Sequence, residues 1–195
     1  MKRFVTILII IILAFTVGCW DRTEIIDLGI VVGLALDKGE KPDEVVSTIQ
    51  IANSQAFLPG GASGSDEPFW TASGKGKTVR EAIEKMDYRI PKILFFGQNR
   101  LLIIGEEAAR GGIDPYLDRV WRSKGVRANI FVAIAKGTGK EILEVAMPTF
   151  QSSAMAMVSL FNLGNRGAII PMTLAEFSYD IGTGRGGAVA PMVAS

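Results

Sequence analysis

Residues 28–36, with the sequence LGIVVGLAL, form the stretch on which the fold depends. This run is apolar and rich in β-branched residues over the length of a typical strand, so we predict a buried strand. Residues 37–43 (DKGEKPD) have the charged, Gly and Pro content of a turn. Residues 45–51 are again rich in β-branched side chains, which predicts a second strand paired with the first as a hairpin.

Downstream of this hairpin, helix and strand patterns alternate. Thr78 and Glu81 have the spacing of a capping box, apolar residues follow at helical spacing, and Pro91 ends the predicted helix. Further strands are predicted at 69–73, 100–104 and 129–135, and further helices at 106–110, 113–122, 140–147, 151–163 and 171–181. We therefore predict an α/β (mixed α+β) fold: a mixed β-sheet with helices packed on its faces and a strand-rich N-terminal portion.

The first 24 residues have the organisation of a secretory signal. Lys2 and Arg3 precede the uncharged apolar run 4–17, which is shorter than the ~20 residues that span a bilayer comfortably. Gly18 and Cys19 close the run. A small residue followed by the only cysteine of the chain is typical of a lipoprotein signal, in which the Cys19 thiol receives a diacylglyceryl group before cleavage.

Two other interpretations of this segment stay open. Residues 4–17 could be an uncleaved anchor, or an ordinary signal followed by an incidental cysteine. Thr16 also stands where lipoprotein signals usually carry Leu. The expected domain organisation is a lipoprotein signal peptide at 1–18, a lipid-anchor linker at 19–27 and an N-terminal α/β domain at 28–195. Because the apolar run 189–193 ends so abruptly, we expect the sequence to hold the front part of a longer protein.

Composition excludes several kinds of function. The chain has no histidine, which removes Ser-His-Asp and Cys-His catalysis and the usual zinc sites, although a carboxylate pair or a Lys base stays formally possible. A single cysteine cannot form an intramolecular disulfide. With 21 basic and 20 acidic residues the chain is almost neutral and gives no reason to propose a nucleic-acid partner.

Two glycine-rich segments match phosphate-binding motifs only superficially. Residues 136–140 (KGTGK) lack the first Gly and the terminal Ser or Thr of a P-loop. Residues 182–187 (GTGRGG) match G-x-G-x-x-G but follow a predicted helix instead of a strand, so we interpret them as a loop. Residues 53–68 are also predicted to be a flexible loop, in which a binding role is the less favoured alternative. We expect no catalytic residue, no metal site and no cofactor.

Several segments, in this order along the chain, resemble the GerAC-type lipoproteins, the C subunits of spore nutrient-germinant receptors. They are GCWDRTE at 18–24, IVVGLALDKG at 30–39, GKGKT at 74–78, EAI at 81–83, FFG at 95–97, AKG at 135–137 and ILEV at 142–145. Family members are considerably longer and carry a further C-terminal region, so the resemblance covers their N-terminal part.

The resemblance implies a non-enzymatic, membrane-anchored lipoprotein subunit that acts in spore germination. Its expected partners are membrane lipid, through a diacylglyceryl Cys19, and two integral membrane subunits of the receptor, with the nutrient bound only through the complex. The expected location is the outer face of the spore's inner membrane. Two alternatives remain: an extracytoplasmic solute-binding lipoprotein that captures a small ligand itself, and a cell-wall hydrolase that uses carboxylates.

Overall fold

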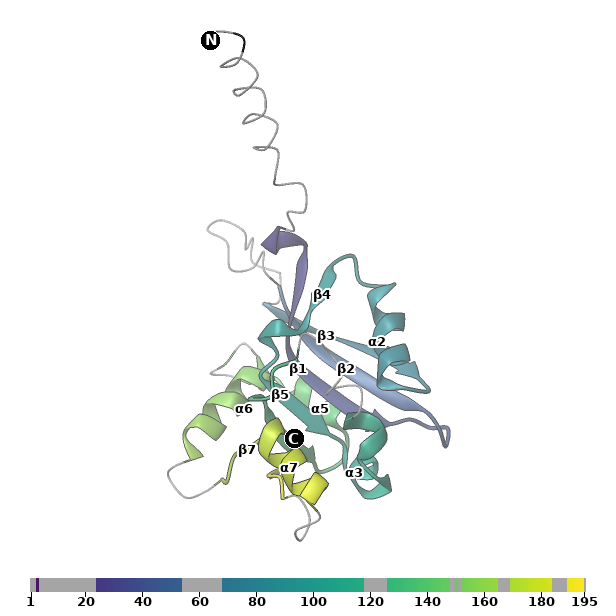
Figure 1. Cartoon of the computed structure of the whole chain (residues 1–195), viewed down its shortest axis with the longest axis vertical. Coiled ribbons are helices and arrows are strands. Elements are labelled where there is room, and N and C mark those ends of the chain that lie inside the picture. The colour runs from purple at the N-terminus through teal and green to yellow at the C-terminus, as the bar shows by residue number, and fades with distance from the viewer. Residues whose placement is uncertain are drawn as a thin grey trace.

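The protein folds around one mixed β-sheet (Figure 1). The computed structural model describes residue 3 and residues 24–53, 68–117, 126–147, 150, 152–164, 169–183 and 189–194. Within these residues the sheet has eight strands, in the order β3-β2-β1-β5-β6-β7, with β4 also paired to β1 and β8 also paired to β6. The strands are β1 (Leu28–Lys38), β2 (Val45–Ala52), β3 (Phe69–Gly76), β4 (Ile93–Phe95), β5 (Leu101–Ile104), β6 (Phe131–Ala135), β7 (Met172–Thr173) and β8 (Met192–Val193).

Strand β1 is the centre of this sheet. One edge of β1 pairs antiparallel with β2, and β2 pairs antiparallel with β3. The other edge of β1 pairs in parallel with β4 over its first residues and with β5 further along. A β-bulge between Val31 and Gly33 separates the two halves of β1. The predicted buried strand and its hairpin partner are therefore confirmed.

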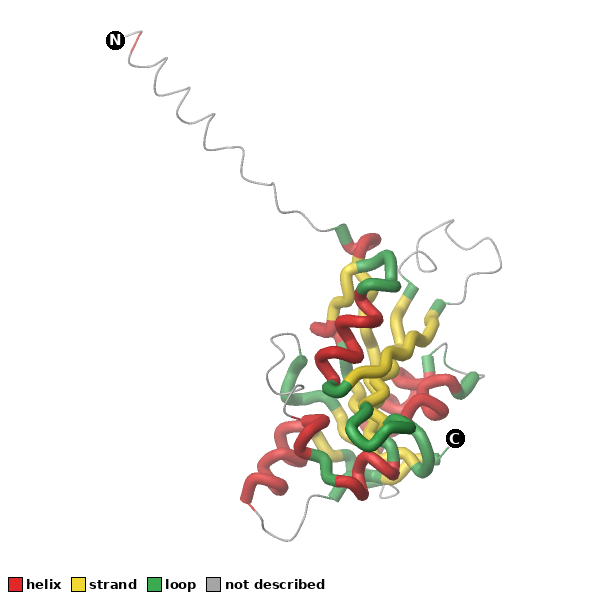
Figure 2. The backbone as a smooth tube through the Cα atoms, turned by 90° about the vertical axis from the view of Figure 1, so that its right-hand side faces the viewer, coloured by secondary structure: helices red, strands yellow, loops and turns green. Residues whose placement is uncertain are grey.

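Helices cover both faces of the sheet, as Figure 2 shows. The helices whose full bounds the described residues contain are α2 (Val79–Asp87), α3 (Glu106–Gly111), α5 (Gly139–Glu144), α6 (Ser153–Asn162) and α7 (Leu174–Thr183), with the short 3₁₀ helices η1 (Ile25–Asp27) and η3 (Phe96–Gln98). Helices α2, α3 and α7 pack on one face through a core that includes Leu34 and Leu36. Helices α5 and α6 pack on the other face, over Ala35. The predicted α/β class, with its strand-rich front, is confirmed.

Thr78 caps the start of α2 as predicted, while the return bond of the capping box goes to Lys77 instead of Thr78. The Thr78 hydroxyl accepts a hydrogen bond from the Glu81 N–H at 3.2 Å, and the Glu81 carboxylate accepts one from the Lys77 N–H at 2.8 Å. Side chains of Val79, Ala82 and Met86 are buried, in agreement with the helical spacing of the apolar residues.

Two predicted helices differ from the structure. The helix predicted at 140–147 already ends at Glu144, because Val145 is extended. The helix predicted at 171–181 begins only at Leu174, because Met172 and Thr173 pair with β6 as β7. Thr173 and Glu176 bond reciprocally at its start, which is a capping box.

Other predicted segments are only partly described. Of the helix predicted at 113–122, residues 114–117 are helical and the rest lies outside the described residues. Of the loop predicted at 182–187, residues 182 and 183 belong to the end of α7, so the prediction was wrong there, and the rest is not described. The loop predicted at 53–68 falls almost wholly outside the described residues.

Helix α2 lies directly on the backbone of β3. A Cβ added to Gly74 would overlap the carbonyl oxygen of Ala82, and one added to Gly76 would lie 2.6 Å from the Ala82 nitrogen. Because these neighbours are backbone atoms of a helix, they could give way only if α2 moved as a unit. Glycine on β3 therefore sets the distance between the sheet and α2.

We expect Gly74→Ala to lower the free energy of unfolding by about 1–3 kcal/mol, because α2 must shift to accommodate the methyl group. The measurement is urea unfolding followed by circular dichroism. Gly182→Ala is the matched control, since nothing lies within 4 Å of its added Cβ near the end of α7. That variant should be neutral or stabilised by up to about 1 kcal/mol. Equal losses in both variants would contradict the close packing.

Candidate functional site

The lipidation site predicted from the sequence, Cys19, lies outside the described residues, as does the whole predicted signal sequence except Arg3. The described part of the fold begins at Glu24, just before η1. Among the described residues no helix is both long and apolar enough to cross a membrane. The candidate sites within the described residues are two buried polar junctions and several surface pockets.

The first polar junction is formed by Asp37, near the end of β1. Its carboxylate oxygens accept hydrogen bonds from the N–H groups of Gly139 at 2.6 Å and Lys140 at 3.0 Å. These two donors belong to the first turn of α5, where a negative charge is favoured. The Asp37 side chain is almost fully buried. Burial raises the pKa of its carboxyl above the ordinary value, and the two backbone hydrogen bonds oppose this rise.

This geometry argues against a P-loop at residues 136–140. In a P-loop, backbone N–H groups at the start of a helix point at a bound phosphate. Here the corresponding N–H groups of Gly139 and Lys140 already bind Asp37 of the same chain. The adjacent pocket, of about 390 Å³, is lined by both acidic and basic groups, including Glu106 and Arg110. These two pair with each other at 2.8 Å.

The second polar junction is formed by Gln50 on β2. Its amide nitrogen donates to the carbonyl oxygen of Leu143 at 2.9 Å and to the Ser153 hydroxyl at 3.1 Å. Its amide oxygen accepts from the Ser152 hydroxyl at 2.6 Å and from the Ala154 N–H at 3.2 Å. All of these contacts are buried, and they join the sheet to the end of α5 and the start of α6.

A pocket of about 320 Å³ lies beside the Gln50 junction. Its walls include Trp70 and Thr71 on β3 and Val145 and Met147 after α5. The Gln50 side chain is one wall, but its amide groups are already bonded within the protein. The volume lies within the range of small-molecule sites, and besides Gln50 the polar groups in the lining are Thr71, Glu144 and Ser153.

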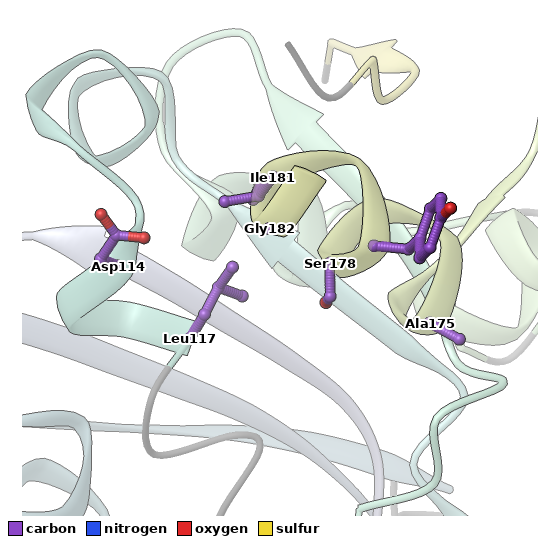
Figure 3. Close-up of a pocket in the computed structure, with 7 residues that line it drawn as sticks. Asp114, Leu117, Ala175, Ser178, Ile181 and Gly182 are labelled. Atoms are coloured by element: carbon purple, nitrogen blue, oxygen red, sulfur yellow. The ribbon is translucent and has the colours of Figure 1, made fainter. Parts of the chain in front are cut away.

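A larger pocket, of about 650 Å³, separates the helical residues 114–117 from α7 (Figure 3). In this view Leu117 lies between Asp114, at the start of that helical segment, and Ser178 on α7. The Ser178 hydroxyl donates to the carbonyl oxygen of Leu174 in its own helix at 2.5 Å. Asp114 and Ser178 therefore do not form a nucleophile–base pair. Among the described residues no cluster of potential metal ligands is found either.

Neither polar junction was identified from the sequence. Residue 37 falls in the predicted turn at 37–43, and residue 50 falls within the second predicted strand, where the sequence gives it no separate role. The available signal was weak: a polar residue within or directly after a run of buried strand residues. Such a residue needs a partner, but the sequence alone does not say which of the distant segments supplies it.

Comparison with known proteins identifies the family. The family model of the spore germination protein N-terminal domain matches residues 21–195, almost the whole chain. The chain therefore belongs to this family of spore germination proteins, and the resemblance to the GerAC-type proteins is confirmed. No solved structure matches the chain.

Relatives of Bacillus subtilis (strain 168) are similar over part of their length. The protein YfkR is 27% identical over 179 residues, which cover 90% of this chain and 45% of YfkR. Spore germination protein KC is 27% identical over 75% of this chain and 37% of its own. Spore germination protein A3 is 28% identical over 66% of this chain and 34% of its own. The chain thus spans less than half the length of these relatives.

The raised pKa of Asp37 predicts a specific pH dependence. Between its ordinary value of 3.8 and the raised value, the folded chain holds this proton more tightly than the unfolded chain. Stability from this group therefore falls as pH rises through that window. We expect Asp37→Asn to cost about 1–3 kcal/mol at pH 4, because an amide NH₂ then faces a backbone donor. The loss should shrink toward pH 7, as measured by urea unfolding at both pH values.

Glu176→Gln is the control for this pH dependence. Hydrogen bonds from Thr173 lower the pKa of the Glu176 carboxyl below its ordinary value. Its contribution is present above that value and is lost as pH falls, so this variant should lose more stability at pH 7 than at pH 4. If the loss in Asp37→Asn grows from pH 4 to pH 7, burial does not dominate at Asp37.

The Gln50 junction gives a second stability prediction. Gln50→Met keeps the shape of the side chain but removes both hydrogen-bonding groups, which leaves the Ala154 N–H without this acceptor. We expect unfolding to become easier by about 2–4 kcal/mol, with faster amide exchange at the start of α6. The exposed Gln98→Met variant should change stability by less than about 0.5 kcal/mol. Unchanged exchange at α6 in Gln50→Met would refute the proposed link.

Proposed function

We propose that the chain is the front part of a lipid-anchored, non-enzymatic subunit of a spore nutrient-germinant receptor. The observation that carries this proposal is the position of Cys19. The family match begins at residue 21, and the only cysteine of the chain stands two residues earlier, directly after a signal-like segment. Family membership and the names of the relatives support a role in spore germination.

Diacylglyceryl transfer to Cys19 would supply two acyl chains. One chain gives only marginal membrane binding, at about 0.8 kcal/mol per buried CH₂, whereas two chains give stable anchoring. A polybasic patch is then unnecessary, and residues 20–27 carry more acidic than basic groups. Anchoring at Cys19 holds the domain on the outer face of the spore's inner membrane.

In this proposal the domain assembles with two integral membrane subunits, and the nutrient acts through the complex. Features of the domain fit a scaffolding role: two of its buried polar side chains, Asp37 and Gln50, are used in internal hydrogen bonds. Glu106 and Arg110 likewise pair with each other. No pair of groups described above is arranged for acid–base or nucleophilic chemistry.

A solute-binding lipoprotein is the second candidate, favoured by the pocket beside Gln50, which is large enough for an amino acid or a sugar. Calorimetric titration of the purified full chain with nutrient amino acids and sugars separates the two candidates. Binding that is weakened by Trp70→Ala in the wall of the pocket would favour direct capture. Binding observed only with the membrane subunits present would favour the receptor subunit.

We expect Cys19→Ser to abolish lipidation and to release the protein or leave it on an uncleaved signal, because only a thiol can form the thioether. Nutrient-triggered germination of the spores should be lost or strongly delayed. Mass spectrometry of the mature N-terminus and membrane fractionation measure the change. Gly18→Ala, which keeps a small residue at the cleavage position, is the matched control and should stay lipidated. An unmodified Cys19 thiol in membrane-bound wild-type protein would refute the anchor.

A further inference from the structure

One end of the sheet carries four exposed apolar side chains, which we call the N-terminal apolar tip. They are Ile25 and Ile26 in η1 and Ile93 and Phe95 in β4, with exposed fractions of 69%, 39%, 57% and 42%. Large aliphatic and aromatic side chains are costly to leave in water when they gather at one place. Single exposed apolar residues are common on protein surfaces, so these four are informative only if they form one continuous surface.

Strand pairing places β4 beside the start of β1, directly after η1. Ile93 lies opposite Leu28 and Phe95 lies opposite Ile30, within the first residues of β1 that follow η1. Side chains alternate along a strand, so Ile93 and Phe95 point to the same face while Leu94 points to the other. Leu94 packs against the core under α2, whereas neither Ile93 nor Phe95 belongs to a core cluster.

A fixed cation lies within this tip. The Lys92 ammonium donates a hydrogen bond to the carbonyl oxygen of Ile26 at 3.0 Å, which ties η1 to β4. Arg89 is exposed nearby in the sequence, and the exposed acidic groups Glu24 and Asp27 flank the two isoleucines. Isoleucine and phenylalanine surrounded by such a mixed polar rim suit the boundary between headgroups and acyl chains.

The tip is also the part of the fold closest to Cys19 along the chain. Only residues 20–24 separate Cys19 from Ile25, so an extended connection reaches at most about 20 Å. Figure 1 places β4 toward the end where the described chain begins, and α3 toward the opposite end. A short tether to a lipid surface raises the effective concentration of that surface at the tip.

We propose that the N-terminal apolar tip inserts into the headgroup–acyl boundary of the membrane that holds Cys19. This inference rests on the lipid anchor of the proposed function and adds an orientation to it. With Ile25, Ile93 and Phe95 in the interface, the other end of β1 and helix α3 point away from the bilayer. The domain then stands on the membrane in one pose instead of moving freely about its tether.

The test uses the full-length lipidated protein in vesicles of phosphatidylethanolamine and phosphatidylglycerol. Because the lipid occupies the only native cysteine, Ile93→Cys supplies a unique free thiol for an environment-sensitive fluorophore. Glu107→Cys, exposed on α3, is the matched control. We expect the label at position 93 to shift to the blue and to be quenched by spin-labelled lipid at least roughly threefold more strongly than the label at position 107.

A second pair of variants separates the tip from the tether. Ile25→Ser should reduce the quenching at position 93, while Val189→Ser, which removes an equally exposed apolar side chain elsewhere, should not. Equal, water-like signals at positions 93 and 107 in fully vesicle-bound protein would overturn the proposal. Protection of position 93 only in native membranes, and never in pure lipid, would overturn it in favour of a protein partner.

Flotation and mass spectrometry, done before the fluorescence measurement, show whether Cys19 is lipidated and the protein is bound to vesicles. A failure of the anchor is thereby distinguished from a failure of the tip to insert. If Cys19 proves unmodified, the same labels are compared in Cys19→Ser protein held by an N-terminal polyhistidine tag on nickel-chelating lipid. A blue-shifted, quenched label at position 93 under those conditions supports insertion of the N-terminal apolar tip even though the native anchor is absent. A water-like label at position 93 under those conditions refutes it.

Discussion

Burial of residues 33–37 of β1 on both faces, with hydrogen-bonded strands along both edges, is the constraint on which this structure depends. Its side chains alternate between the core under α2, α3 and α7, which receives Leu34, and the core under α5 and α6, which receives Ala35. Its two edges bond to β2 on one side and to β4 and β5 on the other. An apolar strand with no face for water must be enclosed in this way, and the helices and remaining strands are arranged around it.

Polar contacts decide how the α5–α6 face is closed. Hydrophobic burial alone would let a helix slide over the sheet, since it has little directional preference. Asp37 holds the start of α5, and Gln50 holds the junction of α5 with α6. Both groups are buried, so a shift of either helix would leave a donor or acceptor without its partner. Specific geometry on this face thus comes from a few hydrogen bonds added to a large apolar contact.

Local sequence patterns predicted much of the fold. The hairpin of β1 and β2 and the helix cap at Thr78 follow from residues close together in the chain. Strands β7 and β8 were not predicted, because each has only two residues and so shows no periodicity. At β7, Pro171 also favoured a helix that begins too early. The junction of Gln50 was not predictable because its partners are far away in sequence. The motif around Cys19, in contrast, is local and can be recognised from the sequence. Lipidation of Cys19 is still a prediction, because the structure does not describe this segment.

The two buried junctions also bear on the order in which the chain can fold. Asp37 and Gly139 are 102 residues apart, and Gln50 and Ala154 are 104 residues apart. Closing loops of that length costs chain entropy before any contact offsets it. The β1–β2–β3 meander and α2 involve much shorter separations, so we expect nucleation there, before either long-range junction forms. We therefore expect the α5–α6 face to close late, since its partners to Asp37 and Gln50 are synthesised only after most of the domain.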